Sequence, residues 1–209
     1  MRCLIISGGE YSKIKLTDKY DLVIACDKGY LHAKKLKIAP DIIVGDFDSS
    51  KEPVSCRRGK HCEPTIIKVD TEKDDTDTGL AIKYALRNGY KYIDIVCALG
   101  KRLDHTLANI SMLKYICENG AKGRIISNDI ELIVIGKGKI NLTKRSNSYL
   151  SIFSLSDKSK INYIKGTKYD TKNIILKNSF PLGISNEFKG KVAEVSVEKG
   201  IILISIIKK

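Results

Sequence analysis

The sequence predicts an α/β fold, with an N-terminal three-layer domain around a mostly parallel sheet and a small all-β sandwich domain after it. Over residues 1–135, short apolar runs alternate with amphipathic segments, which is typical of strand–helix–strand units. Helical periodicity then disappears, and short runs separated by Gly, Asn, Asp and Ser follow, as in antiparallel sheets. We therefore expect domains at 1–135 and 136–209, a division that suits a chain of 209 residues.

Each strand of the first domain is expected where a short apolar run meets a turn signal. The expected strands are RCLIIS (2–7), DLVIACD (21–27), DIIVGDFDS after Pro40, TIIKV (65–69), YIDIVCALG (92–100) and GRIISN (123–128). Helical spacing predicts helices over YLHAKKLKI (30–38), TDTGLAIKYALRNGY (76–90) and LDHTLANISMLKYICENG (103–120). In the middle helix, we expect Leu80, Ala81, Tyr84 and Ala85 to form the buried stripe. In the second domain, runs such as YLSIFSLS, NIILKN and IILISII predict antiparallel strands.

Hydropathy and cysteine usage indicate a cytoplasmic protein. No apolar run approaches the roughly 18 residues needed to span a membrane, and the apolar core of MRCLIISGG is too short for a signal peptide. Three of the six cysteines lie in apolar, strand-like runs, where a reduced thiol behaves as a small hydrophobic group. A zinc site at Cys56, His61 and Cys62 is a weak alternative, because a second pair of ligands is missing from the pattern.

The formal charge of +13 raises the possibility of a nucleic-acid partner. The excess is scattered lysine, since residues 140–209 carry 13 basic and 5 acidic side chains without an arginine-rich arm or an aromatic RNA-binding motif. We interpret these lysines as solvent-facing positions on strands and expect no nucleic-acid partner. Attraction of a polyanionic substrate is a second interpretation.

Polar and glycine residues follow the expected parallel strands at their carboxyl ends, where ligands of open α/β sheets bind. Turns at Ser7-Gly8-Gly9 and Asp27-Lys28-Gly29 follow the first two strands. GDFDS (45–49), the acidic run that begins at Asp70, and GKRLDH (100–105) follow the others. Because neither GxxxxGK[ST] nor GxGxxG is present, the two glycine turns would have to cradle any phosphate.

Two pairs of aspartates in these loops are candidate Mg²⁺ ligands. Asp46 and Asp48 alternate in an extended segment and can share one cation; the alternative is an Asx-turn. Asp74 and Asp77 lie three apart at a helix start; here the alternative is capping, with Asp74 as N-cap. Both pairs at one sheet edge would repel without a cation, and Mg²⁺ commonly binds phosphate oxygens as well.

The segment GKRLDHTLAN supplies cationic and polar groups to the same edge. Arg102 can donate two hydrogen bonds to a phosphate. Asp104, His105 and Asn109 lie on the first turns of the helix, with residues 105 and 109 on one face. For His105, a structural and a catalytic role remain equally open.

Four segments, GDFDS, EKDDTDTGLA (72–81), ALGKRLDHTLAN (98–109) and LGISNEF (182–188), resemble thiamine pyrophosphokinase in order and spacing. The resemblance implies an ATP-binding α/β domain followed by a thiamine-binding β-sandwich, and a homodimer with active sites between subunits. It implies transfer of the pyrophosphoryl group of ATP to the hydroxyl of thiamine, with Mg²⁺, giving thiamine diphosphate and AMP.

The resemblance also implies roles for individual residues. Asp46, Asp48, Asp74 and Asp77 match the acidic positions that arrange Mg²⁺ and the triphosphate, and Asp77 or its neighbour orients or deprotonates the thiamine hydroxyl. Asp27, Thr76, Arg102, Asp104, His105 and Asn109 match family motif positions and are expected at the nucleotide site. The turns after the first two strands add Gly8, Gly9 and Lys28 to the expected nucleotide site. Ser185 and Asn186 match the thiamine side, whereas Asp70 and Asp75 are expected to be bystanders.

The chain departs from the family pattern at two positions. It reads CDKG where members usually read ADGG, and Lys101 stands where many have a glycine. Two rival functions remain open: another nucleotide-dependent phosphotransferase acting on a different alcohol, and a non-enzymatic basic module that binds nucleic acid. The first does not account for LGISNEF, and the second leaves the clustered carboxylates unexplained.

Overall fold

The computed structural model of the chain contains two compact units, which are described separately. The first comprises residues 1–112 and 119–128, and the second comprises 113–118 and 129–209. The structure describes residues 1–45, 64–68, 75–100, 102–145 and 147–209. In this part of the chain, no helix combines the length and apolar character needed to cross a membrane.

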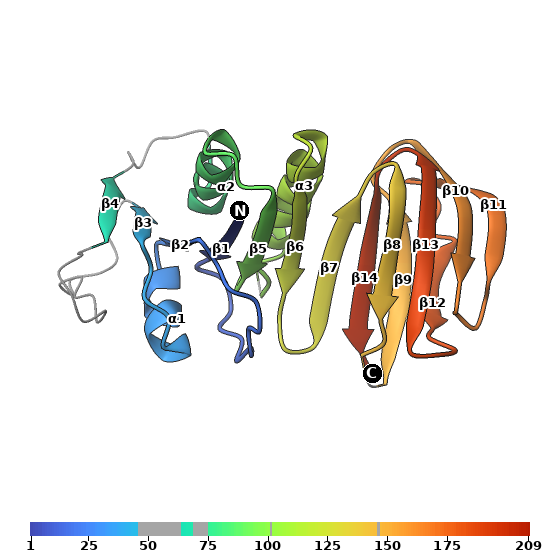
Figure 1. Cartoon of the computed structure of the whole chain (residues 1–209), viewed down its shortest axis with the longest axis horizontal. Helices are drawn as coiled ribbons and strands as arrows, with labels where there is room; N and C mark the ends of the chain where they lie inside the picture. The colour runs from blue at the N-terminus through green and yellow to red at the C-terminus, as the bar shows by residue number, and fades with distance from the viewer. Residues whose placement is uncertain (46–63, 69–74, 101, 146) are drawn as a thin grey trace. The chain divides into compact units, whose positions relative to one another are not determined.

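The first unit contains a sheet of parallel strands in the order β6-β5-β1-β2-β3-β4 (Figure 1). The strands are β1 (Arg2–Ile6), β2 (Leu22–Cys26), β3 (Ile42–Gly45), β4 (Thr65–Lys68), β5 (Tyr92–Val96) and β6 (Lys122–Ile126). All five residues of β2 and four of the five in β1 are buried. Strands buried on both faces explain the continuous apolar runs, and the expected mostly parallel sheet is confirmed.

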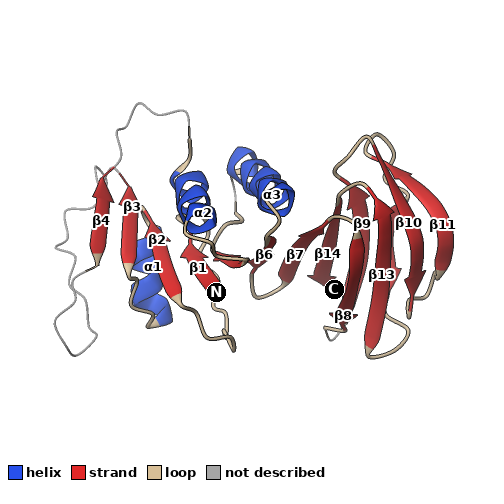
Figure 2. Cartoon of the chain, turned by 45° about the horizontal axis from the view of Figure 1, so that its top comes forward, coloured by secondary structure: helices blue, strands red, loops and turns tan. Residues whose placement is uncertain are grey.

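Helices cover both faces of this sheet, so the expected three-layer arrangement is confirmed. They are α1 (Gly29–Leu36), α2 (Asp77–Arg87) and α3 (Leu103–Glu118). Figure 2 shows α2 and α3 on one face and α1 on the other. On the α1 face, Ala33 packs in one cluster with Leu4, Ile6 and Val23.

The buried face of α2 differs from the expected stripe. Helical spacing predicts Leu80, Ala81, Tyr84 and Ala85, but the structure buries Ala81, Ile82 and Ala85 and leaves Leu80 and Tyr84 only partly covered. Ala81 and Ala85 belong both to the expected stripe and to the observed one, so the apolar pattern alone does not distinguish the two. The packing of α2 against β1, β2 and β3 determines which stripe is buried.

Two of the expected strands end earlier than predicted. The run 92–100 predicts one strand, but β5 ends at Val96 because Cys97 has a φ of 54°. That left-handed conformation is incompatible with a strand. Similarly, β1 ends at Ile6 and leaves Ser7 in a loop. The shortened strands place residues 7–10 and 97–100 in loops beyond the sheet edge.

The second unit is an antiparallel sandwich of two sheets, in the orders β12-β9-β14-β7 and β11-β10-β13-β8. The strands are β7 (Ile130–Ile135), β8 (Gly138–Thr143), β9 (Ser148–Ser154), β10 (Lys158–Lys165), β11 (Thr171–Lys177), β12 (Gly183–Glu187), β13 (Val192–Lys199) and β14 (Ile202–Lys208). One buried cluster contains residues of both sheets, such as Leu150 and Val195, and the expected β-sandwich is confirmed. β7 groups with this unit; the domain boundary near 135/136 remains a proposal.

A buried carboxylate joins three strands of the first unit. Asp94 of β5 accepts hydrogen bonds from Arg124 Nε at 2.6 Å, from the Tyr20 hydroxyl at 2.8 Å and from Arg2 at 3.2 Å. Burial by itself raises the pKa of Asp94, but the hydrogen bonds and charge of Arg124, with those of Tyr20 and Arg2, hold it below its ordinary value. The folded state therefore favours the ionised carboxylate.

We predict that Asp94→Asn lowers the free energy of unfolding by about 1.5–3 kcal/mol at pH 7, because the buried carboxylate loses its charge-assisted hydrogen bonds to the partly buried Arg2 and Arg124. Since the folded pKa of Asp94 is depressed, its contribution is present above the unfolded pKa and is lost as pH falls through the folded pKa. The gap between wild type and Asp94→Asn should therefore narrow below about pH 4. Denaturant unfolding at pH 7 and pH 3 measures both effects.

Asp18→Asn is the matched control, since Asp18 contacts the same arginines but its side chain is 37% exposed. Its effect should stay below about 1 kcal/mol. A pH-independent gap for Asp94→Asn would contradict the assigned charge state.

Candidate active site

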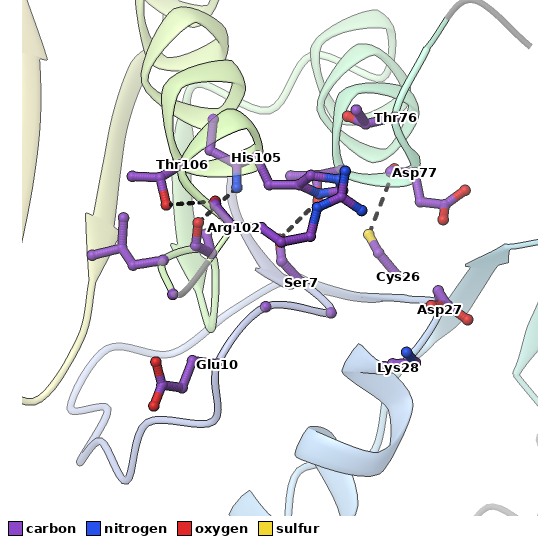
Figure 3. Close-up of a pocket in the computed structure, with 17 residues that line it drawn as sticks. Ser7, Glu10, Cys26, Asp27, Lys28, Thr76, Asp77, Arg102, His105 and Thr106 are labelled. Atoms are coloured by element: carbon purple, nitrogen blue, oxygen red, sulfur yellow. Dashed lines mark hydrogen bonds between the residues drawn. The ribbon is translucent and has the colours of Figure 1, made fainter. Parts of the chain in front are cut away.

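A cleft of about 560 Å³ lies at the carboxyl edge of the parallel sheet. The loops after β1, β2 and β5 line it, together with the first turns of α2 and α3 (Figure 3). All of the lining residues belong to the first unit. The expected convergence of these strand ends is thus present.

The loop after β1 is held against the loop after β5 by backbone hydrogen bonds. Gly9 N–H donates to Cys97 O at 2.9 Å, and Glu10 N–H donates to Leu99 O at 2.8 Å. A Cβ added at Gly9 would lie 2.6 Å from Cys97 O and 2.9 Å from Leu99 O, whereas one added at Gly8 would meet nothing closer than 3.4 Å. Gly9 is therefore required by the approach of the two loops, while a methyl group at Gly8 would make only ordinary van der Waals contacts.

The turn after β2 presents Asp27 and Lys28 to the cleft (Figure 3). Asp27 has a φ of 44°, a left-handed conformation that aspartate tolerates better than most residues. Its backbone N–H donates to Val44 O at 2.9 Å. At Gly29, an added Cβ would lie 1.9 Å from Ile6 O. Glycine here allows α1 to begin directly beside the end of β1.

The first turn of α2 brings Thr76 and Asp77 to the cleft. Thr76 is the N-cap, with its hydroxyl accepting from Gly79 N–H at 3.0 Å. The alternative in which Asp74 caps the helix is therefore wrong, because the helix begins two residues too late for it. Asp77 lies in the first turn, where the helix dipole favours a carboxylate. Asp75 does not line the cleft and pairs with Lys83 Nζ at 2.5 Å.

Arg102, just before α3, and His105 and Asn109, on its first turns, also line the cleft. Arg102 pairs with Asp104 at 2.6 Å, and both side chains are largely exposed, at 72% and 63%. The hydrogen bond from Arg102 lowers the pKa of Asp104, but Asp104 itself is not among the lining residues. Asn109 is buried and donates to the backbone oxygen of Ala98 at 2.7 Å. It holds the loop after β5 in place.

Three of the expected metal-binding aspartates, Asp46, Asp48 and Asp74, lie outside the residues that the structure describes. The same holds for Lys101 and for the residues of the alternative zinc site, Cys56, His61 and Cys62. Within the described part of the chain, no three His, Cys, Asp or Glu side chains are grouped closely enough to hold a metal ion. Asp77 lines the same cleft as Asp27.

Ser185 and Asn186 lie in β12 of the second unit. Ser185 has a φ of 57°. The amide oxygen of Asn186 accepts from Tyr169 N–H, and its nitrogen donates to Thr167 Oγ1 and to Tyr169 O, all at 3.1 Å. The Asn186 side chain thus holds the neighbouring loop in place.

Several lining residues were not identified from the sequence: Glu10, Cys26, Thr78 and Thr106. Glu10 and Thr106 follow motif residues directly, and this adjacency is a usable signal. Cys26 lies within an apolar run and Thr78 on the buried side of a helix, so only the folded geometry places them at the cleft.

A parallel sheet with helices on both faces and a polar cleft beyond its strand ends defines a doubly wound α/β protein with a ligand site at its carboxyl edge. The thiamin pyrophosphokinase catalytic-domain model matches residues 14–125, and the vitamin B1 binding-domain model of the same family matches residues 137–202. The chain belongs to the thiamin pyrophosphokinase family, and the resemblance stated from its four motifs is confirmed.

Individual relatives support the assignment of the chain to this family. The chain is 31% identical over 204 residues to the thiamine pyrophosphokinase of Bacillus subtilis (strain 168), covering 95% of each sequence. It is similar to the crystal structure of thiamine pyrophosphokinase from Bacillus subtilis, with a TM-score of 0.86 and 26% identity over all of both chains. A thiamin pyrophosphokinase family protein from Enterococcus faecalis gives a TM-score of 0.82 and 26% identity, again over both whole chains.

We predict that Gly9→Ala lowers the free energy of unfolding by about 1–3 kcal/mol, because the new methyl group would overlap two backbone oxygens and force the loops apart. Gly8→Ala is the matched control and should change stability by less than about 1 kcal/mol. Thermal or denaturant unfolding of both variants provides the comparison. Equal stability of the two variants would show that the loops are not held at this separation.

Proposed function

We propose that the chain transfers the pyrophosphoryl group of ATP to the hydroxyl of thiamine, giving thiamine diphosphate and AMP, with Mg²⁺ required. The observation that carries the proposal is the cleft: most of its lining residues fall within the segment that the catalytic-domain model matches, and they include residues of the acidic and RLDH motifs. The Bacillus subtilis relative bears the name of that activity.

The donor atoms at the cleft fit Mg²⁺. Asp27 and Asp77 reach it from two different elements, and Mg²⁺ in phosphate-transfer sites binds one or two carboxylates together with waters and phosphate oxygens. We propose Asp46, Asp48, Asp74 and Asp77 as the metal-binding set and add Asp27 to it. When bound, Mg²⁺ supplies neutralisation of the charge on the phosphoryl oxygens.

Cationic side chains at the cleft suit the triphosphate. Lys28 is exposed there, and Arg102 lies across the opening (Figure 3). The ion pair of Arg102 with Asp104 is largely exposed, and such pairs contribute little free energy. Arg102 can therefore leave Asp104 and donate two hydrogen bonds to a phosphate. Gly8, Gly9, Thr76 and His105 complete the proposed nucleotide site, with Asp104 and Asn109 holding its parts in place.

The chemical step forms a bond from the thiamine hydroxyl oxygen to the β-phosphorus of ATP and breaks the bond from that phosphorus to the α,β-bridging oxygen. AMP departs with the electron pair of the broken bond. We assign Asp77 to accept a hydrogen bond, and then the proton, from the attacking hydroxyl. Positioning and electrostatic stabilisation by fixed groups account for most of the rate in such transfers.

On the thiamine side, we propose Ser185 and Asn186 of the second unit, within the segment that matches the vitamin B1 binding domain. In this proposal, Asn186 stabilises the loop at Thr167 and Tyr169 through its three hydrogen bonds. We also propose the domain assignment, ATP binding by 1–135 and thiamine binding by 136–209.

We further propose a cytoplasmic homodimer with active sites at the subunit interface. Free thiols at Cys3, Cys26, Cys97 and Cys117 support a reducing compartment. Exposed Phe180, Leu182 and Ile184 on the second unit support an association surface. Sedimentation as a monomer at assay concentrations would contradict the dimer.

The decisive experiment measures AMP release from ATP and Mg²⁺ with and without thiamine. We expect AMP and thiamine diphosphate in equal amounts, formed only when thiamine and Mg²⁺ are both present. AMP release that does not depend on thiamine would point to a phosphotransferase with another alcohol substrate. An inactive protein with salt-sensitive affinity for oligonucleotides would favour a nucleic-acid module instead.

We predict that Asp77→Asn lowers kcat by at least about a hundredfold, because a preorganised charged group at the reacting centre is lost. Asp75→Asn is the matched control: it is the same substitution two residues earlier, at a side chain that pairs with Lys83 and does not line the cleft. It should retain turnover close to that of the wild type. Similar values of kcat for both variants would contradict a catalytic role for Asp77 and leave it only a structural role at the start of α2.

A further inference from the structure

Two buried hydroxyl groups meet beneath the cleft. Ser7 Oγ, just beyond β1, lies 2.9 Å from Thr78 Oγ1 in the first turn of α2. The two residues are only 3% and 8% exposed. Either oxygen can be the donor, so the pair is satisfied without water. It connects the end of a central strand to the residue that directly follows Asp77.

A second contact holds the same helical turn from another strand. The Cys26 thiol, at the end of β2, donates to the backbone oxygen of Asp77 at 3.6 Å (Figure 3). Residues 77 and 78 are thus each held to a different strand end.

These contacts fix the first turn of α2 to the ends of β1 and β2. Thr76 is exposed, and the N-cap bond it makes is local to the helix. A buried hydroxyl that loses its partner destabilises the fold, so the Ser7–Thr78 hydrogen bond favours this geometry of the turn. Misplacement of a catalytic group by about 1 Å can lower a rate by about a hundredfold.

We propose that Ser7 and Thr78 are positioning residues that set the direction of the Asp77 carboxylate toward the cleft. The inference depends on the role given to Asp77 in the proposed function. Both residues border the cleft, but their hydroxyl groups bond to each other, so we assign their effect to the position of the first turn of α2.

The test compares Thr78→Val, which keeps the side-chain shape and removes the hydroxyl, with Thr78→Ser, which keeps the hydroxyl. Thr78→Val should lower kcat by about tenfold or more while the KM for thiamine changes by less than about threefold. Thr78→Ser should stay within about threefold of wild type in both constants. Ser7→Ala should resemble Thr78→Val, and the double variant should be no slower than Thr78→Val, because both substitutions remove one interaction.

The matched control is Ser154→Ala, which removes a hydroxyl from another buried pair, Ser154 and Ser159 at 2.7 Å in the second unit. It should lower the melting temperature and leave kcat unchanged. If Thr78→Val also lowers only the melting temperature, the hydroxyl pair is purely structural and the proposal is wrong. If Thr78→Val does not fold, Ser7→Ala decides by the same criteria.

Hydrogen exchange separates this proposal from the proposed function. The amide hydrogens of Gly79 and Leu80 bond to Thr76 within the first turn. They should exchange at least about tenfold faster in Thr78→Val than in Thr78→Ser, whatever the catalytic activity. Unchanged exchange would overturn the positioning role. A wild-type protein that releases no AMP would instead overturn the proposed function.

Discussion

The common direction of the strands in the first unit is the constraint on which the site depends. Because the strands are parallel, their carboxyl ends meet at one edge, and the loops that follow them must come together there. Backbone hydrogen bonds continue past the strands, from Ser7 N–H to Val96 O and from Gly9 N–H to Cys97 O. The loops after β1 and β5 are therefore joined by backbone hydrogen bonds, as are the strands that precede them.

The first turn of α2 places the carboxylate of Asp77 at the cleft. Thr76 begins the helix, and contacts from the ends of β1 and β2 hold its first turn. Asp27 reaches the cleft from a left-handed turn, so the carboxylates of Asp27 and Asp77 come from independent elements. Lys28 and Arg102 balance part of their charge. The proposed phosphate transfer needs such a mixture of carboxylates for a cation and cations for phosphate.

Much of the fold could be predicted from the sequence, because it depends on patterns short enough to be local. Apolar runs such as RCLIIS and the change of periodicity after residue 135 identify the strands and the β-sandwich. The positions of Arg102 and Asn109 near the start of a predicted helix indicate that both lie at the cleft, and the structure confirms it. The choice of Ile82 over Leu80 as a core residue was missed, since adjacent stripes on one helix look alike until the helix packs.

The sequence by itself determined the family, the two kinds of sheet and the loops that carry the chemistry, since each follows from residue types at fixed local spacings. Only the tertiary structure decided that Thr76 caps α2, that β5 ends at Val96 and that Ser7 meets Thr78. The last of these outcomes depends on a contact between segments 71 residues apart. Such contacts form only when the strands, helices and loops have packed together, and local spacing carries no record of them.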